Sequence, residues 1–375
     1  MKNLILGAMA LLTSVCFAQV PCDTCTPPPA FTPGAFTNQT GVTNNAGIYQ
    51  WELPTPTPSH YGRIDQFGFF NYARTYQIGK RNYSLTQQFG NRNNAFVVQW
   101  GEDNSSKLLQ VGRRNNASVV QVGDDNCSDG LQVGNRNDLN VLQFGNFNNS
   151  KTQQIGNNNY IEVDQIGNSN ISSASQIGNS NSADIDQLGN NNLSCVVQVG
   201  NQNMAAVNQE GNFNYSEIHQ NGNRNYANVG QEGNFNLAVI DQEGNDNMSD
   251  IDQLGDGNLA YNLQDGNGNM SDIDQEGDDN FSVAYQIGNG NMNLSIQEGD
   301  RNTNEILQDG NFNMVDVQQY GNDNCNTTEQ IGNTNFASTL QVGNLNCAET
   351  YQTGDGHIAT TTQFGSGNYS VIVQN

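Results

Sequence analysis

The sequence of 375 residues is poor in the side chains that most enzymes use. It holds only 3 His and 2 Trp, and 13% of its residues are charged. Three histidines leave little for acid–base or metal chemistry, so we expect no catalytic site, no metal site and no cofactor. A hydrophobic share of 35% beside 40 Gly also argues against a conventional α-rich enzyme.

Basic residues are scarce, above all in the second half of the chain. After Lys151 only Arg224 and Arg301 are basic, and the whole chain carries a net charge of −24 with a pI near 4.1. A nucleic acid or an anionic membrane surface would repel such a chain. We therefore expect no nucleic acid among its partners.

Long apolar runs are missing except at the N-terminus. Lys2, the apolar run from Leu4 to Phe17 and the small Ala18 match the three regions of a secretory signal peptide. Nothing later approaches the roughly 18 apolar residues of a membrane span. We therefore predict a signal peptide over residues 1–18, export from the cytoplasm and no membrane insertion.

Proline and cysteine are also few, with 8 and 7 residues. The prolines gather between residues 19 and 62, which predicts an extended, flexible segment. After residue 18 six cysteines remain, an even number that permits disulfides in an oxidising compartment without specifying them. Cys325 and Cys347 lie 22 residues apart at equivalent repeat positions, so a disulfide between them is possible.

What the sequence does contain is one short repeat. Every eleventh residue from Gln66 to Gln374 is Gln, at 29 positions without a miss. Gly stands two residues after each of the first 28, and Asn stands five residues after each, with His357 the one departure. A fixed internal period of this kind is typical of repeat architectures.

Within each repeat, one strand and one turn are expected. Asn203, Ala205, Val207 and Gln209 alternate with other residues, and a period of two places these four on one face of a strand. Gly and Asn around Gly211 are turn chemistry, because Gly takes positive φ and Asn tolerates it. Since the four columns contain no charged residue from Ile64 onward, this face is predicted to be the interior.

Buried Gln and Asn need partners for their amides, and parallel stacking of identical residues about 4.7–4.9 Å apart supplies them. Turn residues such as Arg92, Asp103 and Arg114 alternate in sign every 11 and recur every 22 residues, which favours two strands per coil. The predicted fold is all-β: a parallel, two-strand-per-coil β-solenoid, cross-β and amyloid-like, of 11-residue half-repeats paired into 22-residue coils, over residues 63–375.

The following residues are predicted to build it. The glutamine ladder includes Gln66, Gln77, Gln88, Gln99, Gln110, Gln121, Gln209, Gln231, Gln253, Gln275, Gln341, Gln352, Gln363 and Gln374. The asparagine ladder includes Asn203, Asn236, Asn247, Asn269 and Asn368, and the turn glycines include Gly68, Gly211, Gly233 and Gly365.

The repeat Gln-x-Gly-x-x-Asn-x-Ala/Ser-x-x-x-Gln, with Gly before the Asn at places such as Gly257 and Gly268, resembles the curlin repeat of curli fibre subunits. The resemblance implies a secreted functional amyloid on the surface of a Gram-negative bacterium. It also implies, as partners, further copies of the chain, a nucleator and an outer-membrane export system. By the same resemblance, the Pro-rich segment of residues 19–62 is a possible export-targeting region.

From these features we expect a structural subunit that assembles head to tail into extracellular fibres for biofilm matrix and adhesion. The final strand, ending on Gln374, is predicted to leave an open edge for the next copy. A monomeric repeat adhesin, or a minor nucleator subunit of such fibres, is the alternative.

Overall fold

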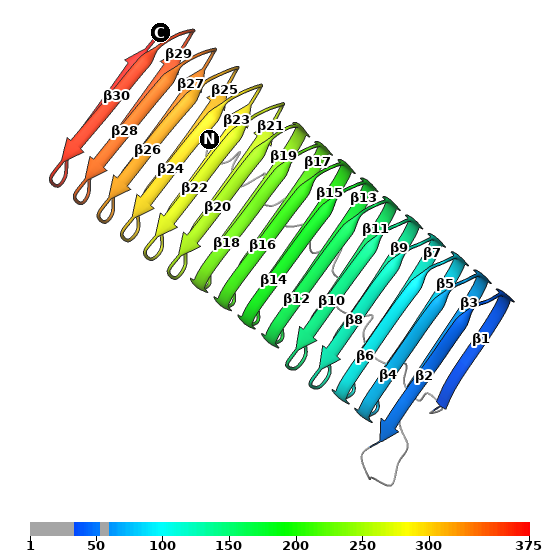
Figure 1. The fold of residues 1–375 in the computed structure, drawn as a ribbon. Helices are drawn as coiled ribbons and strands as arrows, with labels where there is room; N and C mark the ends of the chain where they lie inside the picture. The colour runs from blue at the N-terminus through cyan, green and yellow to red at the C-terminus, as the bar shows by residue number, and fades with distance from the viewer. Residues whose placement is uncertain (1–33, 53–59) are drawn as a thin grey trace. The chain divides into compact units, whose positions relative to one another are not determined.

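The computed structural model describes residues 34–52 and 60–375. These residues form strands and turns without a helix, so no helix among them is long and apolar enough to cross a membrane. Two compact units divide the chain, one ending at Val197 and one beginning at Gln198. Figure 1 shows strands lying side by side, and from β3 onward each strand is joined to the next by a short turn.

The first unit holds the strands up to the boundary, and β15 crosses it. Its strands are β1 Gly34–Val42, β2 Asn45–Glu52, β3 Tyr61–Phe69, β4 Tyr72–Lys80, β5 Tyr83–Asn91, β6 Asn94–Glu102, β7 Ser105–Arg113, β8 Asn116–Val122, β9 Cys127–Asn135, β10 Asp138–Phe144, β11 Asn149–Asn157, β12 Tyr160–Asn168, β13 Ile171–Asn179 and β14 Ser182–Asn190, and the boundary strand is β15 Leu193–Asn201.

The second unit repeats the pattern. Its strands are β16 Met204–Asn212, β17 Tyr215–Asn223, β18 Tyr226–Asn234, β19 Leu237–Asn245, β20 Met248–Leu254, β21 Leu259–Asp265, β22 Met270–Glu276, β23 Phe281–Ile287, β24 Met292–Glu298, β25 Thr303–Asp309, β26 Met314–Tyr320, β27 Cys325–Ile331, β28 Phe336–Val342, β29 Cys347–Thr353, β30 Ile358–Phe364 and β31 Tyr369–Gln374.

In each unit the odd-numbered strands form one sheet and the even-numbered strands form the other. All pairings are parallel, and the register places each ladder glutamine on the next, as in Gln143 against Gln165 or Gln253 against Gln275. Stacked residues are thus 22 apart in sequence, and two strands complete one coil. This confirms the predicted parallel two-strand-per-coil β-solenoid.

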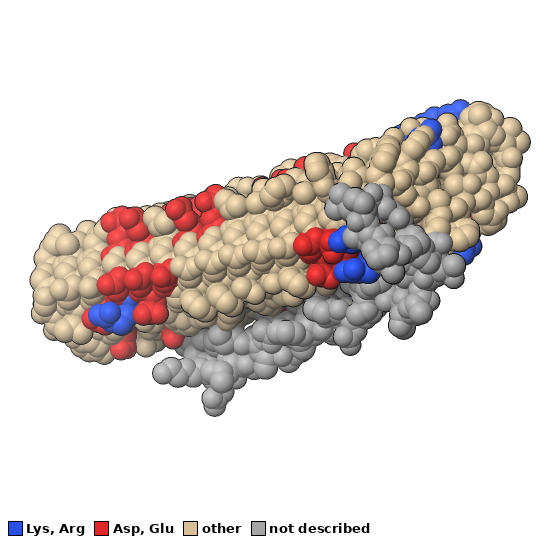
Figure 2. Space-filling model, turned by 90° about the horizontal axis from the view of Figure 1, so that it is seen from below, with Lys and Arg blue, Asp and Glu red and all other residues tan. Residues whose placement is uncertain are grey.

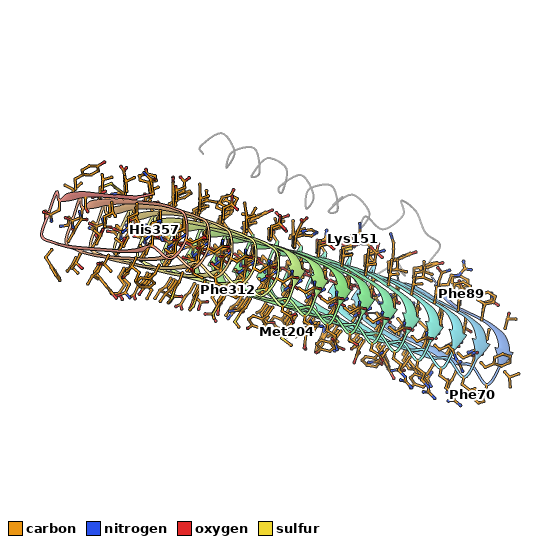
Figure 3. All side chains as sticks on the ribbon, turned by 90° about the horizontal axis from the view of Figure 1, so that it is seen from above. Phe70, Phe89, Lys151, Met204, Phe312 and His357 are labelled. Carbon is orange, nitrogen blue, oxygen red and sulfur yellow. A yellow bond between two sulfur atoms is a disulfide. The ribbon has the colours of Figure 1, made fainter. Side chains whose placement is uncertain are left out.

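The core lies between the two sheets and contains the four uncharged columns. In β12, Ile161, Val163 and Gln165 are fully buried, whereas Glu162 and Asp164 on the other face are only half-buried. Figure 3 shows side chains projecting from the strands both inward and outward. Alternation along each strand therefore separates a buried, uncharged interior from an exterior that carries the charged residues.

Residues 34–52 differ from the extended segment predicted for residues 19–62, because they form β1 and β2. Gln39 lies opposite Gln66, and Gln50 lies opposite Gln77. Gln50 and Gln66 are 16 residues apart instead of 11, so an insertion shifts the phase of the repeat and hides this coil from a search in fixed steps. The predicted signal peptide, 1–18, and the residues up to 33 lie outside the described part of the chain.

Candidate functional site

The glutamine column forms a continuous side-chain ladder in each unit. Nε2 of Gln121 donates to Oε1 of Gln143 at 2.8 Å and to the backbone oxygen of Ser105 at 2.9 Å. In the second unit, Nε2 of Gln253 donates to Oε1 of Gln275 at 2.8 Å. Oε1 of Gln121 accepts from Nε2 of Gln99 at 2.8 Å. Both amide hydrogens and the amide oxygen are thus used inside a buried core, where an unsatisfied polar group costs about 1–3 kcal/mol.

Every predicted ladder glutamine has a hydrogen-bond acceptor for its side-chain Nε2. Nε2 donates to the glutamine one coil later for Gln66, Gln77, Gln88, Gln99, Gln110, Gln121, Gln209, Gln231, Gln253, Gln275, Gln341 and Gln352. Gln363 and Gln374, in the last two strands, donate to the backbone oxygens of Cys347 and Ile358. Oε1 of Gln363 accepts from Nε2 of Gln341 in the preceding coil, and Oε1 of Gln374 accepts from Nε2 of Gln352.

The buried asparagine column works differently from the like-on-like amide bonding predicted for it. Nδ2 of Asn247 donates to the backbone oxygen of Gly266 at 2.8 Å, and its Oδ1 accepts from the backbone N–H of Asn269 at 3.0 Å. The shorter side chain lies beside the turn, where peptide groups of the next coil are within its reach. Each Asn therefore bonds mainly to the backbone of the next coil.

The other predicted asparagines follow this pattern, with one variation at the last coil. Asn203, Asn236 and Asn269 donate to Gly222, Gly255 and Gly288 of the next coil and accept from its backbone. Asn368 donates instead to Oδ1 of Asn346 at 2.8 Å and to the backbone oxygen of Phe364 at 3.1 Å.

A second asparagine column, on the surface, was missed from the sequence. In Asn289, both the backbone N–H and Nδ2 donate to Oδ1 of Asn311, at 3.1 and 3.0 Å. Asp can take the same place, since the backbone N–H of Asp256 donates to Oδ1 of Asp278 at 2.9 Å. The sequence signal for this column is the Gly-Asn dipeptide found in most repeats. It was missed because the same dipeptide is also expected in a turn.

The turn glycines allow the coils to approach closely. Gly68, Gly211, Gly233 and Gly365 have φ of 119°, 118°, 120° and 104°. A Cβ on Gly233 would overlap the carbonyl oxygen of Gly255 in the next coil, whereas a Cβ on Gly365 would meet only Nδ2 of Asn368 at 3.8 Å. Gly is thus required at this position wherever another coil is stacked on it.

Acidic side chains line the outer face of the even-numbered sheet in the second unit. They border a groove of about 530 Å³ lined by Glu210, Glu232, Asp252, Asp274, Glu276 and Glu298, among others. On the face drawn in Figure 2, the acidic residues likewise gather in clusters separated by uncharged stretches. Within residues 34–52 and 60–375, no group of three or more His, Cys, Asp or Glu is placed to hold a metal ion.

Stacked carboxyls in this region have raised pKa values. Burial, then the charges of Asp250 and Asp274, raise the pKa of Asp252 from 3.8 to about 6. Burial, then Asp274, Asp250 and Asp252, raise the pKa of Asp272 to about 6. The register explains the coupling, because Asp250 lies against Asp272 and Asp252 against Asp274.

We expect the second unit to lose stability as the pH rises through this range. The pKa of these two carboxyls is higher in the folded chain than in the unfolded chain, where it is 3.8, so the folded chain binds their protons more tightly. This contribution to stability is complete below pH 3.8 and is lost as the pH rises through about 6. Thermal melting between pH 5 and 7 should show a falling Tm, and Asp252→Asn/Asp272→Asn should flatten the slope. An equal slope in the variant would contradict this origin.

Cys325 and Cys347 are register partners on β27 and β29, and a disulfide joins them with their Cα atoms 4.6 Å apart. Cys127 and Cys195 each take part in a disulfide as well, but not with one another, because β9 and β15 lie three strands apart in their sheet. The bond between Cys325 and Cys347 ties two successive coils near the C-terminal end of the second unit. Cys22 and Cys25 lie outside the described residues.

Comparisons with known proteins agree with the repeat geometry. The curlin associated repeat family matches residues 134–167, 156–189, 178–211, 203–233, 222–255 and 250–277. The first three matches begin 22 residues apart, which is one coil of the structure. No curated protein matches the chain. These matches support the resemblance to the curlin repeat family over residues 134–277, and the matched stretches share their Gln, Gly and Asn positions with the whole series from Gln66 to Gln374.

Proposed function

We propose that this chain is a secreted structural subunit that assembles head to tail into curli-like amyloid fibres outside a Gram-negative cell. The curlin repeats and the β-solenoid support a curli-like structural role. The fibres would serve in biofilm matrix and surface adhesion, and a curli-type nucleator and outer-membrane export machinery would be the partners. The observation that carries the proposal is the open edge at the last coil.

The interior columns lose their cover at β31. In β29, Ala348, Thr350 and Gln352 are at most 1% exposed, whereas the corresponding residues of β31 are half-buried because none of the described strands is stacked on them. Unpaired strand edges of this kind favour addition of another strand. A solenoid that stays monomeric normally protects such an edge with a capping element.

The chemistry at the two edges is complementary. Each ladder bond runs from Nε2 of one coil to Oε1 of the next coil, beginning with Gln39 to Gln66 at 2.9 Å. At the last coil Gln374 donates one hydrogen to the backbone oxygen of Ile358, at 3.0 Å. Its second hydrogen can then donate to the first ladder glutamine of an added copy, whose Oε1 is the acceptor.

The first edge is also accessible. β1 is exposed along nearly its whole length, including Gln39 and the neighbouring Asn38 and Thr40. Its register with β3 is the same parallel register found throughout, so it presents the columns that β30 or β31 would require. One chain can therefore template the next without a new kind of contact.

Assembly of the purified chain without its signal peptide tests this function. We expect light scattering to rise over hours and the product to give a fibre reflection near about 4.8 Å from stacked strands. The matched control is the same protein held in denaturant, which should neither scatter nor diffract in this way. A folded chain that stays monomeric would favour the adhesin alternative instead.

A further inference from the structure

The outer face of the even-numbered sheet in the first unit carries two adjacent apolar columns. We call them the apolar stripe. It consists of Tyr49, Trp51, Tyr76, Ile78, Val98, Trp100, Val120, Val122, Leu142 and Phe144, from β2, β4, β6, β8 and β10. Register pairs each residue with its equivalent on the next strand, as in Ile78 against Trp100 and Val122 against Phe144.

The stripe is accessible and ordered. Trp51, Trp100 and Phe144 are 53%, 60% and 55% exposed. The rings of Tyr49 and Tyr76 stack with centroids 4.8 Å apart, and the rings of Trp51 and Tyr76 lie 6.2 Å apart. Side chains held by their neighbours in this way form a preorganised surface, which loses little rotamer freedom on binding.

The repeat itself does not require this apolar surface. In the second unit the same two columns hold residues such as Asn208 with Glu210, and Asp274 with Glu276, which border the acidic groove. The fold therefore tolerates charge at these positions. Contiguous exposed apolar residues of this extent usually mark a contact surface.

Resting on the proposed fibre function, we infer that the apolar stripe packs against the same stripe of a chain in a neighbouring filament. Two flat sheet faces pack well at a separation of about 10 Å, with their side chains interdigitating. The stripe is uncharged, so two copies can meet without burying an unpaired charge. The first acid in its columns is Asp164, on β12, which limits the contact to the first unit.

The size of the stripe explains why filaments, and not single chains, should pair through it. Five strands at about 4.8 Å spacing and two side-chain columns cover about 300–400 Å². A stable protein pair buries about 800 Å² on each partner. One stripe is too small for that, but a filament presents one stripe per chain, and many weak contacts then act together.

Charge pairing between turns is the rival explanation for lateral association. Several turn acids, however, are already paired within their own stack: Asp246 with Arg224 at 2.6 Å, Asp323 with Arg301 at 2.8 Å, and Asp103 with Arg81. They are therefore poor partners for arginines of another filament. The apolar contact also predicts that bundles persist at about 1 M salt, where exposed charges are screened.

The test compares a stripe variant with a matched variant of the second unit. Trp100→Lys/Phe144→Lys places two charges on the stripe. Leu254→Lys/Ile331→Lys changes two outward residues that are 46% and 39% exposed and lie outside it. Elongation is followed by light scattering of sheared seeds, and bundling by low-speed sedimentation and negative-stain images at about 0.1 and about 1 M NaCl.

We expect wild-type filaments to bundle at both salt concentrations. The stripe variant should elongate at the wild-type rate, but the amount of filament that sediments as bundles should fall at least about tenfold. The control variant should behave like wild type. Bundling of the stripe variant, single wild-type filaments, or wild-type bundles that dissolve in salt would each overturn the inference and leave the proposed function intact. Failure of every protein to form filaments would overturn both.

Discussion

Gly365→Ala should fold like the wild-type chain and yet lower the rate of filament elongation by at least about tenfold, a difference of ~1.4 kcal/mol. At the equivalent Gly343, a Cβ would overlap the carbonyl oxygen of Gly365 in the next coil. At Gly365 a Cβ would meet only Nδ2 of Asn368, at 3.8 Å, because no coil of the described residues is stacked there. The conflict would arise only when a second copy docks.

The nearby Gly367→Ala is the matched control. Gly367 has φ of 72°, and a Cβ there would have no atom within 4 Å. Ala at the φ of 104° of Gly365 costs of order 1–3 kcal/mol locally, whereas Ala at the φ of 72° of Gly367 costs less because that value lies close to the left-handed region. Only Gly365→Ala should block growth, and hydrogen exchange of β29 to β31 in the monomer checks that the last coil stays folded in both.

Adding a minor fraction of Gly365→Ala to wild-type protein makes the test stronger. A variant that joins through its intact first edge would leave a blocked last edge, so filaments should become shorter and growth should stop early. Unchanged growth of the mixture and of the pure variant would show that the next copy does not stack on this turn. The proposed head-to-tail geometry would then be wrong.

Gly266→Ala should destabilise the second unit by about 3 kcal/mol or more, the range of severe backbone and packing defects. Gly266 has φ of 133°, and a Cβ on it would overlap the carbonyl oxygen of Gly288 in the next coil. Relief requires separation of two coils, which would also break the neighbouring glutamine and asparagine bonds. The expected result is local loss of β19 to β23.

Gly268→Ala, in the same turn, should cost no more than about 1 kcal/mol. Gly268 has φ of 66°, and a Cβ there would have no atom within 4 Å. At the equivalent turn position the chain already accepts Asp246, with φ of 59°. Urea unfolding and hydrogen exchange of the two variants measure the difference, and equal stabilities would contradict the close-approach explanation.

The glutamine ladder could be predicted from the sequence because its period never changes from Gln66 to Gln374. A period of 11 with two-residue alternation leaves few ways to bury uncharged amides together. The first coil escaped the same reasoning because an insertion between Gln50 and Gln66 shifts the phase. A search that allowed one insertion would have found Gln39, Asn44 and Gln50 at the repeat spacing.

Bonding partners were harder to predict than positions. Gln and Asn were both expected to stack on themselves, but only the longer Gln side chain reaches its equivalent throughout the interior. Asn247 lies beside the turn and bonds to the backbone near Gly266 instead. The surface column that includes Asn289 and Asn311 had the composition of a turn, so its hydrogen bonds between coils became visible only in three dimensions.

The glycines show the same limit. Positive φ at Gly233 could be anticipated from the turn chemistry, but the close approach of Gly255 depends on how one coil stacks on the next. This second requirement excludes even Asn at that position, although Asn tolerates positive φ. It also distinguishes Gly354 and Gly365, where a Cβ would meet only side-chain atoms, from the turn glycines that have another coil stacked on them, and the elongation prediction rests on that difference.

A density map of the assembled filament, resolved well enough to separate strands, tests the central claim most directly. The account predicts an unbroken glutamine ladder that passes from Gln374 of one chain into the first coil of the next, with strands about 4.8 Å apart across the junction. Glutamines that face water, or copies joined through another surface with the last coil left open, would contradict it.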